Sequence, residues 1–155
     1  MSESDRYSRR FPIHQRKDYA DGRKPGERDR DRVLYSTAFR RLSRVTQVVS
    51  PDERQILHNR LTHSLEVAQI ARGLANQLIN NNDPVWVQGA GGIDPYVVEA
   101  AALAHDLGHP PFGHVAESEL DRILQNDHGL TDGFEGNAQS FRIITKLAAR
   151  YPDTD

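Results

Sequence analysis

The sequence predicts an all-α protein that folds as a helical bundle. Apolar residues recur at spacings of about three and four along most of the chain, which is the period of a helix with one buried face. Clusters of proline, glycine and asparagine separate these periodic segments. With 155 residues, the chain is long enough for one domain with a hydrophobic core. These three observations together favour a bundle of helices around one core.

Residues 1–28 predict an irregular basic arm, because they are polar, rich in arginine and interrupted by prolines and glycines. The helical domain is expected to occupy residues 29–155. Its first helix is predicted over 29–44, where the apolar residues with helical spacing are Val33, Leu34, Ala38, Phe39 and Leu42. Residues 46–57 contain adjacent β-branched residues and a Ser-Pro turn, which predict a short strand or an extended turn, with a short β-hairpin as the further alternative.

Asn59 predicts the beginning of the second helix, because its side chain can accept a hydrogen bond from an exposed backbone N–H in the first turn. A broad apolar stripe continues from there to the Asn-Asn-Asn-Asp-Pro sequence at 80–84, where this helix is expected to end. Residues 83–93 contain several glycines and predict a loop.

Asp94 and Pro95 predict the start of the third helix, as an N-cap followed by a proline in the first helical position. This helix is apolar on nearly all sides, which predicts burial between other helices, and Gly108 is expected to end it. The apolar spacing predicts two more helices, over 114–126 and 133–151.

The composition of the chain excludes several kinds of site. Because there is no cysteine, the chain can form no disulfide, thiolate metal site or thiol nucleophile, and any metal site must use histidine and carboxylate. No segment approaches the roughly 20 apolar residues of a membrane span, and the first residues do not have the pattern of a secretory signal. We therefore expect a cytoplasmic protein with no membrane partner.

Charge is divided unevenly along the chain. Residues 1–60 contain 15 Lys and Arg against 9 Asp and Glu, which gives a net charge of +6. Residues 61–155 contain 5 against 13, which gives −8. The first part is therefore suited to bind anions and the second to bind cations, metal ions included, although many single charges of this kind belong to solvated helix faces.

His105 and Asp106 stand at the end of the buried third helix. A carboxylate there needs a compensating cation, because burial and the negative end of the helix dipole both disfavour its charge. The adjacent histidine, together with His63 on the preceding helix, makes a metal ion the expected cation rather than an arginine. A single histidine on an apolar face is more often a hydrogen-bonded core residue, so the prediction depends on all three residues.

His114 and Glu117 are three residues apart at the start of the fourth helix and therefore share a face. The carboxylate can orient the imidazole and raise its basicity, which predicts a general acid or base beside the metal site. The alternative is an exposed His-Glu pair that only stabilises the helix start. His109 lies in the turn between the helices and is a third catalytic candidate. The proline-rich sequence that follows it stiffens this turn.

Five segments resemble the HD-domain metal-dependent phosphohydrolases, and in particular their deoxynucleoside triphosphate triphosphohydrolase (dGTPase) branch. They are Arg30 to Leu42 (RDRVLYSTAFRRL), Thr46 to Val48 (TQV), Asn59 to Val67 (NRLTHSLEV), Ala104 to His114 (AHDLGHPPFGH) and Gly133 to Gln139 (GFEGNAQ). The resemblance extends over about residues 29–150. Although a lone His-Asp pair is common, this combination of motifs is highly specific.

The resemblance implies an HD-type helical bundle that hydrolyses a dNTP at the α-phosphorus. The products would be a deoxynucleoside and inorganic triphosphate, and the family name favours dGTP as substrate. The resemblance also implies a divalent metal ion, such as Mn²⁺ or Mg²⁺, with His63, His105 and Asp106 as ligands. Residues 29–155 would form the N-terminal part of such a domain.

The same resemblance implies roles for residues around the metal. His114 and Glu117 match the catalytic pair of the family, although the sequence does not decide whether His114 handles a proton on the attacking or on the leaving oxygen. Arg60 matches an arginine near the phosphates, and Gln47 matches a glutamine that senses the sugar 3′-hydroxyl. Arg41 is a further substrate-binding candidate, because basic groups of the first 60 residues are suited to the triphosphate charge.

The family's metal site takes a fourth ligand, an aspartate on a helix well downstream of the His-Asp pair. We therefore expect this chain to be the N-terminal portion of such an enzyme. A homo-oligomer and a nucleotide or nucleic-acid effector are further expected partners. Two alternatives stay open: another HD phosphohydrolase, such as a nucleotidase or phosphodiesterase, and a non-catalytic helical module that binds nucleotide or nucleic acid.

Overall fold

The computed structural model describes residues 22–45 and 59–148, and the regular elements in these ranges are helices. The predicted all-α fold is therefore confirmed. Most of the predicted arm and the whole hairpin predicted at 46–57 lie outside the described residues. Among the residues that are described, no helix is both long enough and apolar enough to cross a membrane.

The helix predicted over 29–44 is wrong in its boundaries, because the chain bends at Ser36. Helix α2 covers Pro25–Leu34 and so begins inside the predicted arm, with proline in its first turn. Ser36 caps α3 (Thr37–Arg41) by accepting a hydrogen bond of 3.1 Å from a backbone N–H, and a 3-10 turn, η1 (Leu42–Arg44), follows. The apolar spacing continues across this bend, so periodicity alone does not reveal it.

Asn59 begins α4 (Arg60–Asn81) as predicted, since its side chain accepts a hydrogen bond of 3.0 Å from a backbone N–H of the first turn. The loop predicted over 83–93 is wrong in part, because it contains a short helix, α5 (Pro84–Gly89). Asp83 caps this helix at 2.7 Å and a proline follows in its first turn. An aspartate cap followed by proline is also the signal that predicted the third helix, at Asp94.

The three remaining predicted helices are present. Asp94 caps the first of them through a hydrogen bond of 2.9 Å, as predicted. The last begins at residue 136 rather than 133, because Glu135 caps it by accepting bonds of 2.9 and 2.6 Å from two backbone N–H groups. The elements are α6 (Pro95–Ala104), α7 (Gly113–Asn126), α8 (Gly136–Arg142) and a π-helical continuation, η3 (Ile143–Leu147).

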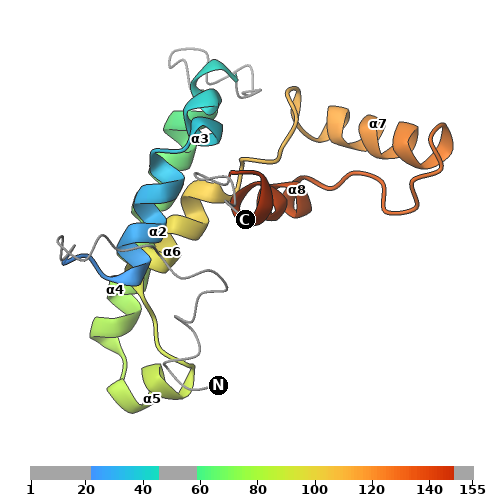
Figure 1. Cartoon of the computed structure of the whole chain (residues 1–155). Helices are drawn as coiled ribbons and strands as arrows, with labels where there is room; N and C mark the ends of the chain where they lie inside the picture. The colour runs from blue at the N-terminus through green and yellow to red at the C-terminus, as the bar shows by residue number, and fades with distance from the viewer. Residues whose placement is uncertain (1–21, 46–58, 149–155) are drawn as a thin grey trace, which may run out of the picture.

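The core lies where α2 and α4 pack against α6, and these three helices run side by side (Figure 1). Helix α8 lies near the C-terminal end of α6, while α7 extends away from this body (Figure 1). The turn after α6 is anchored in the core, because its Leu107 is only 2% exposed. The buried cluster consists of Phe39, Leu42, Ala68, Leu103, Ala104 and Leu107.

Phe39→Ala is expected to lower the free energy of unfolding by about 3 to 5 kcal/mol, because it removes a large side chain that is 2% exposed and leaves a cavity. Urea unfolding followed by circular dichroism measures this loss. Phe141→Ala is the matched control: its ring is 67% exposed, so its loss is expected to stay within about 0.5 kcal/mol. Equal losses in the two variants would contradict the position of Phe39 in the core.

Candidate metal centre

His63, His105 and Asp106 come together where α4 and α6 meet. His63 lies in the first turn of α4, His105 directly follows α6, and Asp106 is the next residue. One potential ligand atom from each of the three lies within 4.8 Å of the others, and the two imidazole rings are 5.4 Å apart between their centroids. The packing of α4 on α6 thus assembles the group that the sequence singled out for metal binding.

The orientation of His105 suits a metal ligand. Its Nδ1 lies 2.7 Å from the Ala102 carbonyl oxygen, to which it donates, so Nε2 is the free ring nitrogen. That Nε2 is 3.5 Å from Oδ2 of Asp106. Two adjacent ligands that are each about 2.1 Å from a metal ion stand roughly 3.0 to 3.5 Å apart. Two imidazoles and a carboxylate at this spacing fit a divalent metal ion.

The other carboxylate oxygen of Asp106 has two nitrogen neighbours, one of them on an arginine. Its Oδ1 lies 3.8 Å from Nη1 of Arg60 and 3.6 Å from Nδ1 of His109. The Asp106 side chain is 13% exposed and that of Arg60 is 9% exposed, so this charge pair is mostly buried. The sequence favoured a metal ion over an arginine as the compensating cation for Asp106. The structure places an arginine there in addition to the histidines.

His114 and Glu117 form the expected pair, with 2.8 Å between Nδ1 and Oε2. The second carboxylate oxygen of Glu117 accepts a hydrogen bond of 2.7 Å from the Gly136 N–H. This backbone bond and, after it, the bond to His114 hold the pKa of Glu117 below its ordinary value of 4.5. The His114 side chain is 86% exposed, so the pair presents an oriented imidazole to solvent.

His109 lies between the two groups. Its Nδ1 faces Asp106, and its ring is 6.0 Å from the ring of His114. The chain turns sharply after it, because Phe112 and Gly113 both have positive φ angles, 70° and 64°. A positive φ is uncommon for phenylalanine, and it is the feature of this turn that the sequence did not reveal. After this turn, His114 at the start of α7 has its ring 6.0 Å from that of His109.

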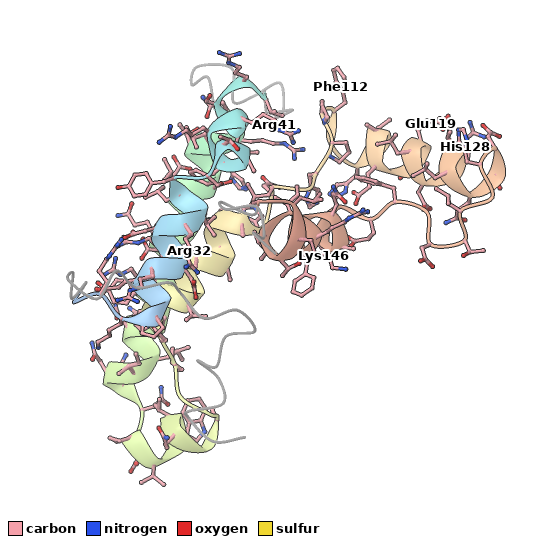
Figure 2. All side chains as sticks on the ribbon, in the orientation of Figure 1. Arg32, Arg41, Phe112, Glu119, His128 and Lys146 are labelled. Atoms are coloured by element: carbon pink, nitrogen blue, oxygen red, sulfur yellow. The ribbon has the colours of Figure 1, made fainter. Side chains whose placement is uncertain are left out.

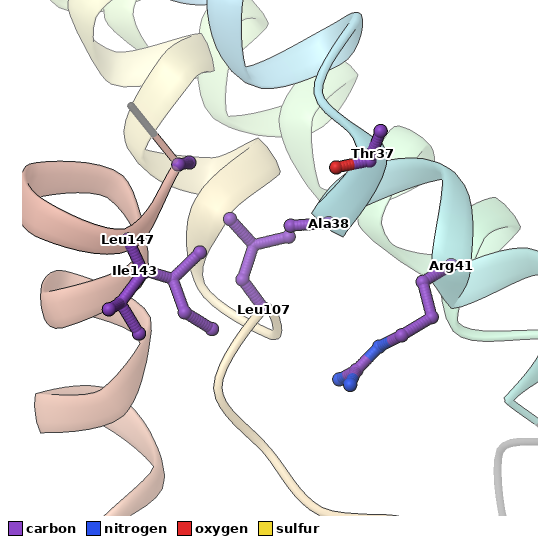
Figure 3. A pocket seen from close by; sticks show the side chains of 7 residues that line it. Thr37, Ala38, Arg41, Leu107, Ile143 and Leu147 are labelled. Carbon is purple, nitrogen blue, oxygen red and sulfur yellow. The ribbon is translucent and has the colours of Figure 1, made fainter. Parts of the chain in front are cut away.

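The described residues include two of the three predicted substrate-binding residues, Arg60 and Arg41. Arg60 lies beside Asp106, as described above. Arg41 lines a pocket of about 460 Å³ between α3 and η3, with Leu107, Ile143 and Leu147 on the opposite side (Figure 3). Gln47 lies outside the described residues.

The HD domain family matches residues 60–151, which is more than half of the chain. The chain belongs to the HD domain family. The resemblance that the motifs predicted is confirmed at this level. The matched range contains every candidate ligand and proton-transfer residue of the HD domain, whereas Arg41 and Gln47 precede it.

Several curated relatives share the name deoxyguanosinetriphosphate triphosphohydrolase-like protein and align with most of this HD-domain chain. The relative from Bradyrhizobium sp. (strain ORS 278) is 53% identical over 86% of the chain. Those from Wolinella succinogenes and Caulobacter sp. (strain K31) are 46% and 45% identical over 86% and 95% of it. The chain spans only 30%, 33% and 32% of the length of these three relatives.

Glu117→Gln is expected to lower the stability of the HD domain at pH 7 by about 1 kcal/mol, because the charged carboxylate accepts two hydrogen bonds. The folded-state pKa of Glu117 is lowered, so this contribution is present above 4.5 and is lost as the pH falls through the folded-state value. Urea unfolding at pH 7 and at about pH 3 tests this. If the stability difference between variant and wild type were as large at the lower pH as at pH 7, the prediction would be contradicted.

Proposed function

We propose that the protein hydrolyses deoxynucleoside triphosphates in a metal-dependent reaction and releases the deoxynucleoside and inorganic triphosphate. The observation that carries this proposal is that His109 stands between a three-residue ligand group and the His114–Glu117 pair, with its Nδ1 3.6 Å from Asp106 and its ring 6.0 Å from that of His114. Membership of the HD domain family and this ligand group support a metal-dependent phosphohydrolase. The names of the relatives favour a deoxynucleoside triphosphate, with dGTP first.

His63, His105 and Asp106 would hold the divalent ion, Mn²⁺ or Mg²⁺ or a similar metal. When bound, such an ion supplies Lewis acidity to a phosphate oxygen and acidifies water. Arg60 and His109 flank the Oδ1 atom of Asp106, at 3.8 and 3.6 Å. The Oδ2 atom remains beside Nε2 of His105.

His114 would move the proton. Because its Nδ1 is bonded to the Glu117 carboxylate, Nδ1 carries a hydrogen, and Nε2 is the atom that accepts or donates the proton at the reacting oxygen. The carboxylate of Glu117 stabilises the positive imidazolium that forms when His114 takes up a proton. His109 would orient water or phosphate, which its place between Asp106 and His114 supports.

The anionic triphosphate would meet the basic part of the chain. Nε and Nη1 of Arg60 are buried without a hydrogen-bond partner among the described residues, so they have capacity to bind a phosphate oxygen. Arg41 offers a second cation from the pocket beside Leu107. Gln47 belongs to this proposal as the contact to the sugar 3′-hydroxyl, a role that rests on the family resemblance.

We also propose that the protein acts in the cytoplasm as a homo-oligomer and responds to a nucleotide or nucleic-acid effector. Exposed apolar side chains support self-association, since large apolar surface is usually covered by a partner. Val115 is 81% exposed and Phe141 is 67% exposed. The basic first 60 residues, with a net charge of +6, support an anionic effector.

The direct test is product analysis with purified protein. Each of the four dNTPs is incubated with Mn²⁺ or Mg²⁺, and the products are separated by anion exchange and identified by phosphorus NMR. The assay uses the 155-residue chain and, in parallel, the chain extended by the downstream residues of the Bradyrhizobium relative. We expect triphosphate and deoxynucleoside, and no product after the metal is chelated.

Other products would separate the alternatives. Orthophosphate or a nucleoside monophosphate would replace this proposal by a different HD phosphohydrolase activity. Nucleotide binding that weakens steeply with salt, persists in His105→Ala and Asp106→Ala, and yields no product from either polypeptide would replace it by a non-catalytic binding module.

A further inference from the structure

Ser140 of α8 joins that helix to the turn that carries His105 and Asp106. Its hydroxyl donates a hydrogen bond of 2.9 Å to the carbonyl oxygen of His105 and accepts one of 2.9 Å from the N–H of Gly108. Ser140 is 6% exposed, so both bonds are shielded from water. They connect segments that are 35 and 32 positions apart in the sequence.

Helix α8 lies directly on this turn, with no side chain of the turn between them. A Cβ atom on Gly108 would fall 2.2 Å from the backbone nitrogen of Ser140 and 2.4 Å from the carbonyl oxygen of Gly136. Glycine at 108 therefore permits the contact, and the small Ser140 side chain reaches the backbone on both sides of Asp106. Figure 1 shows α8 beside the end of α6.

The Asp106 carboxylate depends on its backbone for its position. Its oxygens lie 3.5, 3.6 and 3.8 Å from the side-chain nitrogens of His105, His109 and Arg60, which is longer than a normal hydrogen bond. The imidazole of His105, in contrast, is held by the Ala102 carbonyl at 2.7 Å. Any group that holds the backbone around Asp106 therefore also positions the carboxylate.

The other end of α8 contacts the proton-transfer pair. The Gly136 N–H donates to Glu117 at 2.7 Å, and a Cβ on Gly136 would lie 3.0 Å from the ring of His109. One short helix thus contacts both the turn of the metal residues and the residues that orient His114. A shift of α8 would disturb both groups together.

We propose that Ser140 is a positioning residue of the metal centre. By holding the backbone from His105 to Gly108, its hydroxyl keeps Nε2 of His105 and Oδ2 of Asp106 directed at the same ion. Ser140 is not a member of the ligand group, and it acts through two of its members. The inference rests on the metal centre of the proposed function and goes beyond the roles assigned there, because ligands on a turn bind tightly only when neighbouring groups hold them.

The test measures metal binding by the whole chain rather than hydrolysis. Manganese titration by calorimetry is expected to show about tenfold weaker binding in Ser140→Ala, the scale typical for groups that hold metal ligands. Cobalt replaces manganese in a second measurement, in which the visible absorption spectrum is expected to change because the ligand geometry changes. Ser140→Thr keeps the hydroxyl and is expected to restore the affinity.

Thr145→Val is the matched control. It also removes a hydroxyl hydrogen bond from the same helical segment, that of Thr145 to the Phe141 carbonyl oxygen at 2.6 Å, but the residue is exposed and its bond stays within that segment. Its manganese affinity and cobalt spectrum are expected to equal those of the wild type. Ser140→Cys, which retains the size but weakens both bonds, serves if Ser140→Ala does not fold.

Unchanged manganese affinity and cobalt spectrum in Ser140→Ala, or in Ser140→Cys where alanine does not fold, would overturn the inference. So would an equal loss in Thr145→Val, or a wild-type chain that binds no metal. A chain that binds manganese, responds to Ser140→Ala and releases no triphosphate would contradict the proposed function alone. The two proposals are thus tested by separate measurements.

Discussion

Asp106→Ala is expected to abolish measurable Mn²⁺ binding and, with it, hydrolysis. The change removes the only carboxylate of the ligand group and leaves two imidazoles, which hold a divalent ion weakly. It also leaves the mostly buried guanidinium of Arg60 without the carboxylate at 3.8 Å. Breaking a buried pair in this way is expected to cost about 3 kcal/mol of stability, while the helical circular dichroism spectrum is retained below the unfolding transition.

Calorimetric manganese titration and urea unfolding measure the two effects of Asp106→Ala separately. Asp121→Ala is a suitable control, because Asp121 is also a partly buried aspartate and accepts a hydrogen bond of 2.9 Å from the Phe134 N–H. That variant is expected to lose stability and to keep its metal affinity. Manganese binding by Asp106→Ala at wild-type strength would remove Asp106 from the ligand group.

His114→Ala is expected to keep the metal and to lose turnover by about 10²- to 10⁴-fold, the usual contribution of a positioned acid or base. His114 lies outside the ligand group and is bonded to Glu117 instead. Its side chain is 86% exposed, so little packing is lost. Triphosphate release under saturating dNTP measures the turnover, and manganese calorimetry measures the retained metal.

His128→Ala provides the control for this second variant. His128 is an exposed histidine in the segment after α7, at the far end of that helix from His114 (Figure 2). Its removal is expected to change neither turnover nor metal affinity. If His114→Ala lost the metal as Asp106→Ala does, the division between ligands and proton-transfer pair would be wrong.

Local signals in the sequence predicted helix beginnings well. Asn59 and Asp94 cap helices as expected, because a cap is a hydrogen bond between a side chain and a backbone N–H two or three residues away. The errors lie where apolar spacing or a high glycine content concealed such signals. Ser36 interrupts the helix predicted over 29–44, and Asp83 begins a helix inside a predicted loop.

The residues of the candidate site could be selected from the sequence, but most of their contacts could not. His114 and Glu117 were expected to meet, because three residues separate them on one helix. The 3.8 Å approach of Arg60 to Asp106 joins two different helical segments, and no spacing in the sequence predicts it. Ser140 carries no chemical signal of its own, and its role follows only from its two bonds to the turn.

By itself, the sequence determined the all-α class, the caps at Asn59 and Asp94, the histidine and carboxylate character of the candidate metal ligands, and the family. Tertiary structure alone decided which cation accompanies Asp106 and which helix supports the turn after α6. The physical reason is the range of the interactions. Caps and helical faces depend on residues within one turn of each other, whereas the meeting of α4, α6 and α8 depends on how whole helices pack around the core.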